Sequence, residues 1–196
     1  TAANPSAPAG AVVTSSVTYN TYVSTAGLNS NTTYYFSVKA TNNNGIATTY
    51  TSVVATATLA SQPASLTFNT VPPTASTIRL DWSGGSNGPG TIYTALMSTA
   101  ADPSAPAGAV VTTSVTFNAY VSTSGLNANT TYYFQVRATN NNSVDTTYAS
   151  IVATATLASQ PSGLTFNTVP PTSSAIRLDW SAGTNGPSTL YTALIS

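Results

Sequence analysis

The sequence repeats itself at a fixed interval of 98 residues. The stretch SQPASLTFNTVPPTASTIRLDWS begins at Ser61, and a nearly identical stretch begins at Ser159, 98 positions later (159 − 61). The segment that opens at Thr1 returns at Thr99 with the same offset (99 − 1), so the 196 residues hold two periods. A period of this kind constrains the architecture more than any local pattern, because one structural unit must recur along the chain. We therefore expect an array of like units.

The unit boundaries are predicted from the most linker-like stretch of each period. Residues 59–63, and their copy at 157–161, place small and polar side chains before a proline that cannot continue a paired central strand. About a hundred residues is the size of one small all-β domain. These boundaries predict the back half of a domain at 1–58, a complete domain at 59–156, and the front half of another at 157–196.

Each half domain would expose half of a hydrophobic core if it stood alone. Because Ser196 followed by a residue like Thr1 reproduces the internal junction Ser98-Thr99, head-to-tail continuation would complete a domain at every joint. Continuation could be covalent, with this sequence a window on a longer polymer. The alternative is that separate chains donate strands to one another.

Charge is scarce in this sequence. It has four basic and four acidic residues, no histidine and no cysteine, so charged residues make up 4% of the chain against roughly 25% in ordinary soluble domains. A near-zero net charge favours self-association. Binding to nucleic acid is not expected, because a phosphate-binding face needs clustered Lys and Arg. No apolar run approaches the roughly eighteen residues of a membrane span, and the composition, rich in Ser, Thr and Asn, predicts an extracellular or cell-surface protein.

The acid and base groups needed for catalysis are almost absent. The only carboxylates are those of Asp81, Asp102, Asp145 and Asp179. Asp81 and Asp179 occupy the same site in successive units, so they cannot form the close pair that glycoside hydrolysis requires. Asp102 is replaced by Asn4 in the other copy, which argues against a calcium site. We expect no enzyme activity, no cofactor and no metal.

Short alternating stretches predict β-strands. In residues 78–82, Ile78, Leu80 and Trp82 share one face while Arg79 and Asp81 share the other. About seven such stretches, separated by turns and without a helical period, predict an all-β fold of tandem antiparallel β-sandwiches. The aromatic residues at inward positions are expected in the core: Phe36, Phe68, Trp82, Phe134, Phe166 and Trp180.

Several of these residues resemble the fibronectin type III family, whose fold is an immunoglobulin-like sandwich. The resemblance covers essentially the whole chain and is carried by Trp82, by Leu126, Ala128, Thr130 and Tyr132, and by Phe134, Val136, Ala138 and Asn140. It implies a tyrosine corner, in which the phenol of Tyr132 bonds backbone upstream, with Tyr34 as its counterpart. The chain has Ser30 and Ala128 where the family often has proline. The resemblance implies little about function, because this sandwich serves mostly as a spacer, scaffold or adhesive module.

Outward tyrosines and sequons are the candidate sites for contacts with other molecules. Tyr35 and Tyr133 fall on the outward face of the longest predicted strand, and Tyr22 and Tyr120 are placed similarly. They predict contacts with a neighbouring chain or a sugar, or ordinary cross-strand packing. Sequons occur at Asn31, Asn129 and Asn141, which either carry glycans or form polar turns.

Three functions are compatible with these features. The first is a structural segment of an extracellular fibre, stalk or adhesin, in which the same linker geometry recurs and the chain associates with itself. The second is an adhesive module that binds a glycan or a protein. The third is a non-catalytic spacer in a secreted carbohydrate-active enzyme.

Overall fold

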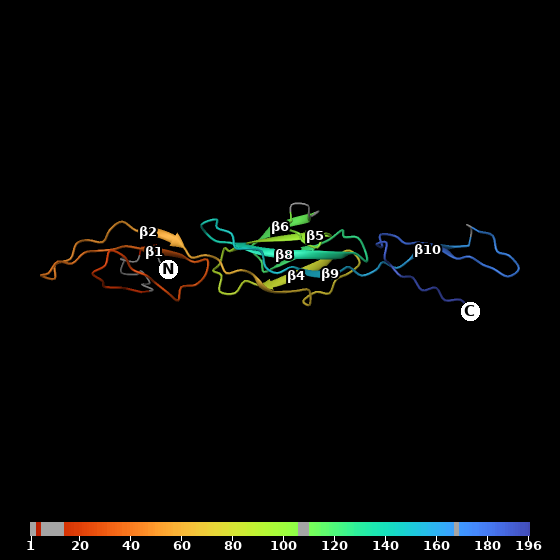
Figure 1. The fold of residues 1–196 in the computed structure, drawn as a ribbon, viewed down its shortest axis with the longest axis horizontal. Coiled ribbons are helices and arrows are strands. Elements are labelled where there is room, and N and C mark those ends of the chain that lie inside the picture. Colours follow the sequence, from red (N-terminus) through yellow and green to blue (C-terminus); the bar gives the residue numbers. More distant parts are fainter. Residues whose placement is uncertain (1–2, 5–13, 106–109, 167–168) are drawn as a thin grey trace. The chain divides into compact units, whose positions relative to one another are not determined.

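The structure, a computed structural model, describes residues 3–4, 14–105, 110–166 and 169–196, and every regular element in these ranges is a β-strand. Figure 1 labels most of the strands. They are β1 (Thr33–Phe36), β2 (Val54–Ala57), β3 (Ala64–Thr67), β4 (Ile78–Ser83), β5 (Ile92–Ser98), β6 (Val110–Thr116), β7 (Tyr120–Thr123), β8 (Thr131–Thr139), β9 (Val152–Ala155), β10 (Ser162–Thr165) and β11 (Asp179–Ser181).

Strands β3 to β9 form two sheets, which we call the central sandwich. One sheet has the order β3-β4-β7 and the other the order β6-β5-β8-β9. Strands β4 and β7 are antiparallel with Ile78 opposite Thr123, and β8 and β9 are antiparallel with Thr131 opposite Ala155. A three-stranded and a four-stranded antiparallel sheet with these crossovers form a fibronectin type III or immunoglobulin-like sandwich. The predicted all-β fold is therefore confirmed.

The core of the central sandwich follows the alternation of its strands. On β4, Ile78, Leu80 and Trp82 are at most 5% exposed, whereas the residues between them are more accessible. The same holds for apolar residues of β8, where Phe134 is 1% exposed and its ring lies 5.3 Å from that of Phe68. Strand side chains alternate between the two faces of a sheet, so every second residue points into the core. Trp82 and Phe134 thus lie in the core as expected, whereas Phe68 is only half-buried, although its ring packs against that of Phe134.

Residue contacts group the chain into two compact units. The first unit contains Thr1–Ala64, Gly84–Thr94 and Val136–Ala149, and the second contains Ser65–Ser83, Ala95–Gln135 and Ser150–Ser196. Strands β5 and β8 pass from one unit into the other. The β1–β2 pair belongs to the first unit and the β10–β11 pair to the second.

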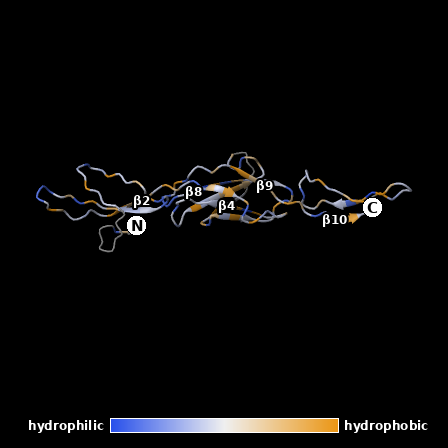
Figure 2. Cartoon of the chain, turned by 90° about the horizontal axis from the view of Figure 1, so that it is seen from below, coloured by the Kyte–Doolittle hydropathy of each residue, from blue (hydrophilic) through white to orange (hydrophobic). Residues whose placement is uncertain are grey.

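The two end segments, residues 14–58 and 157–196, do not bury their inward aromatic residues as expected. Trp180 is 37% exposed although its counterpart Trp82 is 5% exposed, and Phe166 is 52% exposed. Phe36 is half-buried, whereas its counterpart Phe134 is 1% exposed. The prediction of a core position is wrong for these residues, because burial requires facing strands, which among the described residues only the central sandwich provides. Figure 2 shows apolar residues along both end segments as well as the central strands.

Candidate functional site

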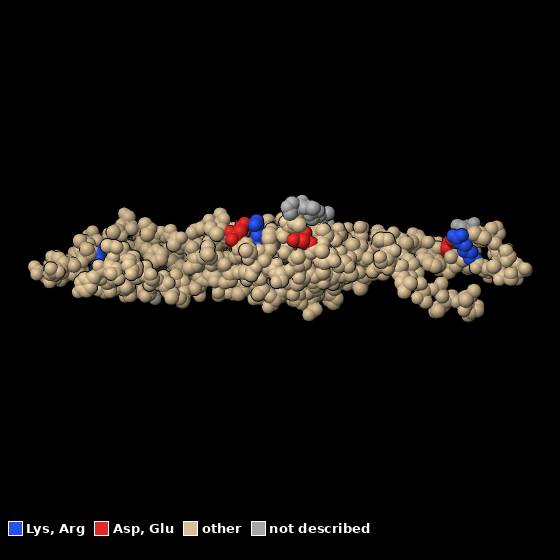
Figure 3. Space-filling model, in the orientation of Figure 1, with Lys and Arg blue, Asp and Glu red and all other residues tan. Residues whose placement is uncertain are grey.

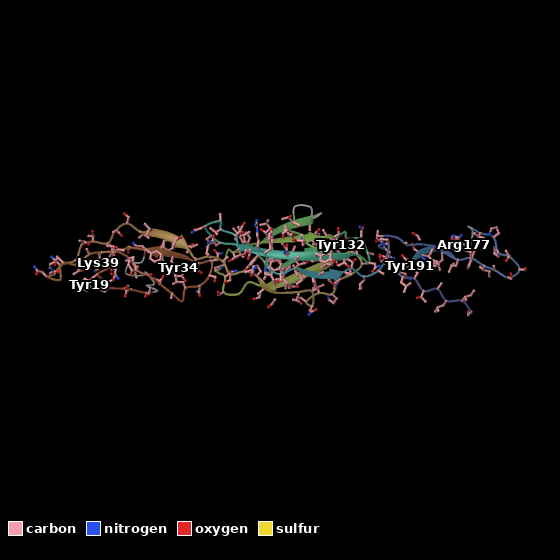
Figure 4. All side chains as sticks on the ribbon, in the orientation of Figure 1. Tyr19, Tyr34, Lys39, Tyr132, Arg177 and Tyr191 are labelled. Carbon is pink, nitrogen blue, oxygen red and sulfur yellow. The ribbon has the colours of Figure 1, made fainter. Side chains whose placement is uncertain are left out.

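Two buried tyrosine side chains hold the loops of the candidate site in place through hydrogen bonds. The Tyr132 hydroxyl accepts a hydrogen bond from the backbone N–H of Asn127 at 3.0 Å, and the Tyr34 hydroxyl accepts one from Asn29 at 2.9 Å. Both tyrosines, labelled in Figure 4, are less than 10% exposed. Each bond spans five residues, as the resemblance to the tyrosine corner implied, and this expectation is confirmed. The corner fixes the residues just before the tyrosine, 29–32 in the first copy.

Asn31 turns that first loop through a left-handed conformation. Its φ angle is 43°, a region that asparagine visits more readily than most residues. The neighbouring Ser30 forms an isolated parallel bridge with Asn87, and its carbonyl accepts the N–H of Gly88 at 2.9 Å. The tyrosine-corner loop therefore pairs, backbone to backbone, with a loop about sixty residues further along. We call this contact the first junction.

The side chain of Asn31 extends the contact on both sides. Its Nδ2 donates to Thr91 Oγ1 at 2.6 Å, and the same threonine hydroxyl donates to the carbonyl of Gly88 at 2.7 Å. Its Oδ1 accepts the backbone N–H of Asn141 at 2.6 Å. Asn31 is 1% exposed, and a buried polar side chain is stable only when its donors and acceptors are used in this way.

Gly88 permits the close approach of the two loops. A Cβ atom built on Gly88 would lie 2.7 Å from the carbonyl oxygen of Asn31 and 3.0 Å from Thr32 Oγ1. Real Cβ atoms do not approach backbone oxygens this closely, so a side chain here would push the loops apart. Glycine at this position is a packing requirement of the junction.

The predicted linker is held in place at the first junction. Asn87 Oδ1 accepts the backbone N–H of Ser61 at 2.6 Å, and Asn87 Nδ2 donates to the Ser61 carbonyl at 3.0 Å. On the other side, the N–H of Asn31 donates to the carbonyl of Leu59 at 3.0 Å. Linker residues 59–61 are thus bonded to both loops, which restricts the freedom that a short polar linker would otherwise have.

A third loop, residues 140–142, also contacts the segment that precedes the linker. Asn140 Nδ2 donates to the Thr58 carbonyl at 3.1 Å, and Asn142 Nδ2 donates to Thr56 Oγ1 at 3.0 Å. Gln62 Nε2 adds a bond to the Tyr148 carbonyl at 2.7 Å. The first junction is therefore closed by amide side chains and backbone groups, without an ion pair among its described residues.

The same junction recurs 98 residues later, between loops 127–130 and 182–189. Asn129 has a φ angle of 46°, Ala128 bridges to Asn185, and a Cβ atom on Gly186 would lie 2.7 Å from the Asn129 carbonyl. The equivalent hydrogen bonds are Gly186 N to Ala128 O (2.9 Å), Asn129 Nδ2 to Thr189 Oγ1 (2.8 Å), Thr189 Oγ1 to Gly186 O (2.7 Å), Asn129 N to Leu157 O (3.1 Å), Ser159 N to Asn185 Oδ1 (2.6 Å) and Asn185 Nδ2 to Ser159 O (2.9 Å). We call this the second junction.

The sequence analysis did not single out the Asn87-Gly88-Pro89 loop as a candidate site. The signal was present in the identity of Asn87-Gly88-Pro89 with residues 185–187. An Asn-Gly-Pro sequence does mark a turn, but it does not show what the turn packs against. The structure shows that this turn packs against the tyrosine-corner loop of the preceding domain.

The three predicted glycosylation sites differ in accessibility. Asn31 is buried and its Nδ2, the atom that would carry a sugar, donates to Thr91. Asn129 is half-buried with its Nδ2 bonded to Thr189. Asn141 is exposed, and among the described residues its Nδ2 makes only long hydrogen bonds of 3.4 Å to the Asn31 carbonyl and to Thr33 Oγ1. Glycosylation stays a prediction, and the burial favours Asn141 over Asn31.

The candidate interface tyrosines also differ. Tyr35 and Tyr133 are half-buried, whereas Tyr22 is 69% and Tyr120 is 39% exposed. The Arg79 guanidinium carbon lies 4.0 Å from the centre of the Tyr120 ring, within the range of a cation–π contact. Contacts with other chains or sugars at these four tyrosines stay a prediction.

The carboxylates considered for catalysis have structural partners. Asp81, Asp145 and Asp179 each form an ion pair with an arginine, at 2.7, 2.9 and 2.7 Å. The hydrogen bond to Asp81 raises the pKa of the Arg79 guanidinium. Figure 3 shows the charged side chains of one face as a few small groups on an otherwise uncharged surface. In the described ranges, no three acidic, His or Cys residues gather to hold a metal, and no helix is long and apolar enough to cross a membrane.

No protein-family model matches the chain, and no curated protein matches it. Among solved structures, it is similar to the human collagen alpha-1(XX) fn3 domain (19% identity, 53% of this chain, 91% of that chain, TM-score 0.41). It is also similar to an Fn3-like protein from Clostridium thermocellum (21%, 48%, 90%, 0.36) and to rat CD45 domains d3–d4 (17%, 73%, 74%, 0.41). The strand order and the tyrosine corner of Tyr132 identify the central part of the chain as a fibronectin type III-like sandwich.

Proposed function

We propose that this chain is a structural segment of an extracellular fibre, stalk or adhesin that extends head to tail. Its domains are the back half at 1–58, the complete domain at 59–156 and the front half at 157–196. The observation that carries the proposal is that the hydrogen bonds joining the tyrosine-corner loop, the Asn-Gly-Pro loop and the linker recur at an interval of one repeat.

A repeated junction supports a linear array for a geometric reason. If each domain meets the next through the same bonds, one rotation and one translation recur along the chain, which produces an open filament unless the rotation closes a ring. The first junction buries Asn31 and bonds the linker on both sides. A junction of this kind fixes the orientation of one domain relative to the next.

The low charge of the surface supports self-association as well. The described ion pairs are internal to a strand or hairpin, and the net charge is zero, so neighbouring copies repel one another little. The partner of the array would then be another copy of the same unit.

Amide hydrogen exchange of the 196-residue protein tests the proposal. Gly88 and Gly186 lie in loops, and their N–H groups are protected only if the junctions hold. Gly27 and Gly125 are loop glycines whose N–H groups make no hydrogen bond among the described residues, so they are the controls. The proposal predicts slow exchange at Gly88 and Gly186 and fast exchange at the controls. Equally fast exchange at all four would show that the junctions do not persist.

An adhesive module is the second candidate, supported by the exposed tyrosines. Tyr22 is 69% exposed, and Tyr120 presents a ring stacked by Arg79. Tyrosine is common in the centre of protein interfaces. Such a site would be detected by titrating the protein with oligosaccharides and following the tyrosine ring signals. The Tyr120→Ala variant, titrated in the same way, is the comparison.

A further inference from the structure

The two end segments expose apolar side chains that the central sandwich buries at equivalent positions. Val38 is 64% exposed, whereas Val136, its counterpart 98 residues later, is fully buried. In the last segment, Ile176 is 64% exposed against 1% for Ile78, and Leu194 is 93% exposed against 9% for Leu96. The residues at these positions are identical in the two periods, so the difference in exposure comes from the lack of facing strands among the described residues of each end segment.

The strands missing from one end segment are present in the other. Residues 14–58 correspond to 112–156, which supply β7, β8 and β9 in the central sandwich, and residues 157–196 correspond to 59–98, which supply β3, β4 and β5. In the central sandwich, β4 pairs with β7 in one sheet and β5 lies beside β8 in the other. Each end segment therefore carries the neighbours that the other lacks.

We propose that residues 157–196 of one copy of this chain pair with residues 14–58 of a second copy, in the register of the central sandwich. The occupant of each exposed face is thus another copy of the same chain. This inference rests on the proposed head-to-tail array and names the contact that extends it. It is supported by the central sandwich itself, where the same two sequences already pair.

The β4–β7 register gives the residue pairs of this contact. In the central sandwich Leu80 lies opposite Val121 and Arg79 opposite Ser122. In the proposed contact, the residues of β4 are replaced by those 98 positions later and the residues of β7 by those 98 positions earlier. Leu178 of one copy then lies opposite Val23 of the next. Arg177 then lies opposite Ser24. Charge does not oppose the pairing, because Arg177 is already paired with Asp179 at 2.7 Å.

Disulfide trapping tests this register in a chain without native cysteine. Since the N–H of Trp82 donates to the carbonyl of Ala119, Arg79 and Ser122 form a non-hydrogen-bonded pair, whose Cα atoms lie about 4.5 Å apart in antiparallel sheets. This distance is within reach of a disulfide. The double variant Ser24→Cys/Arg177→Cys should therefore give a ladder of cross-linked multimers on a non-reducing gel. Tyr22→Cys/Asp179→Cys, from the other non-hydrogen-bonded pair of this register, should give the same ladder.

The control variant is Ser24→Cys/Thr165→Cys. Thr165 pairs with Asp179 across β10 and β11, so it lies one strand further from Ser24, about 10 Å away by the spacing of strands. It should stay monomeric. Monomer only from both test variants, an intramolecular bond, or an equal ladder from the control would overturn the inference. Protection of the Gly88 amide in the same samples separates this failure from failure of the proposed function, because that junction lies within one chain.

Discussion

The side-chain amide of Asn31 donates to the hydroxyl of Thr91 at 2.6 Å, and 98 residues later the amide of Asn129 donates to Thr189 at 2.8 Å. Both asparagines have left-handed backbones, with φ angles of 43° and 46°. The geometry of the junction is therefore a property of the repeat and is specified anew in each period.

Substitutions of Asn31 separate the contribution of its side-chain hydrogen bonds from that of its left-handed backbone conformation. Asn31→Ala removes the side-chain hydrogen bonds and places a less suitable residue in a left-handed conformation, which together should cost about 2 kcal/mol and speed exchange of the Gly88 amide about thirtyfold. Asn31→Gly keeps the backbone preference and should have a smaller effect, about tenfold. Unchanged exchange in both variants would contradict the role assigned to Asn31.

Removing the phenol oxygen of Tyr132 should destabilise the tyrosine corner. In Tyr132→Phe the backbone N–H of Asn127 loses its acceptor, which should cost about 0.5 to 1.5 kcal/mol, the net contribution of a typical hydrogen bond, because this bond is part-buried. The matched control is Tyr133→Phe, because the Tyr133 hydroxyl makes no hydrogen bond among the described residues. Urea unfolding followed by circular dichroism measures both, and equal midpoints would refute the prediction.

The two tryptophans provide a comparison of the same residue in two environments. Trp82→Ala should cost about 3 to 5 kcal/mol because Trp82 is 5% exposed. Trp180→Ala, at a position 37% exposed, should cost about 1 kcal/mol or less in dilute protein. Urea unfolding at low concentration distinguishes them. Equal large costs would show that the last segment has a core of its own.

Much of this fold was accessible from the sequence. The alternation of Ile78, Leu80 and Trp82 indicated which face of that strand is buried, because side-chain direction in a strand is a local property. The tyrosine corner was also predictable, since its bond spans only five residues. Both features depend on residues that are close together in the chain.

The remaining features depend on partners that the local sequence does not specify. Trp180 has the same local pattern as Trp82, yet burial is decided by a facing sheet. Gly88 likewise resembles an ordinary turn glycine, and its importance comes from a carbonyl 57 positions earlier (88 − 31). Non-local contacts of this kind cannot be deduced from alternation or turn chemistry alone.

Stability should be independent of pH between about 5 and 8, because the chain has no histidine. Hydrogen bonds from the side chain and backbone of Ser104 lower the pKa of Asp102 below its ordinary value of 3.8. A lowered folded-state pKa adds stability above the ordinary value, and this is lost as the pH falls through the folded value. Urea midpoints of the protein and of Asp102→Asn should therefore be flat from pH 5 to 8 and converge only in acid. A transition near neutral pH would contradict this.

The most direct test of the head-to-tail array is electron microscopy of the concentrated 196-residue protein, with the Gly88→Ala/Gly186→Ala variant alongside. Since both junctions are built from the same bonds, the filaments should show one axial repeat that corresponds to a single sandwich. The variant, in which each added Cβ atom meets a carbonyl oxygen at 2.7 Å, should give irregular filaments without that repeat. Compact closed oligomers, or an axial repeat unaffected by the variant, would contradict the account.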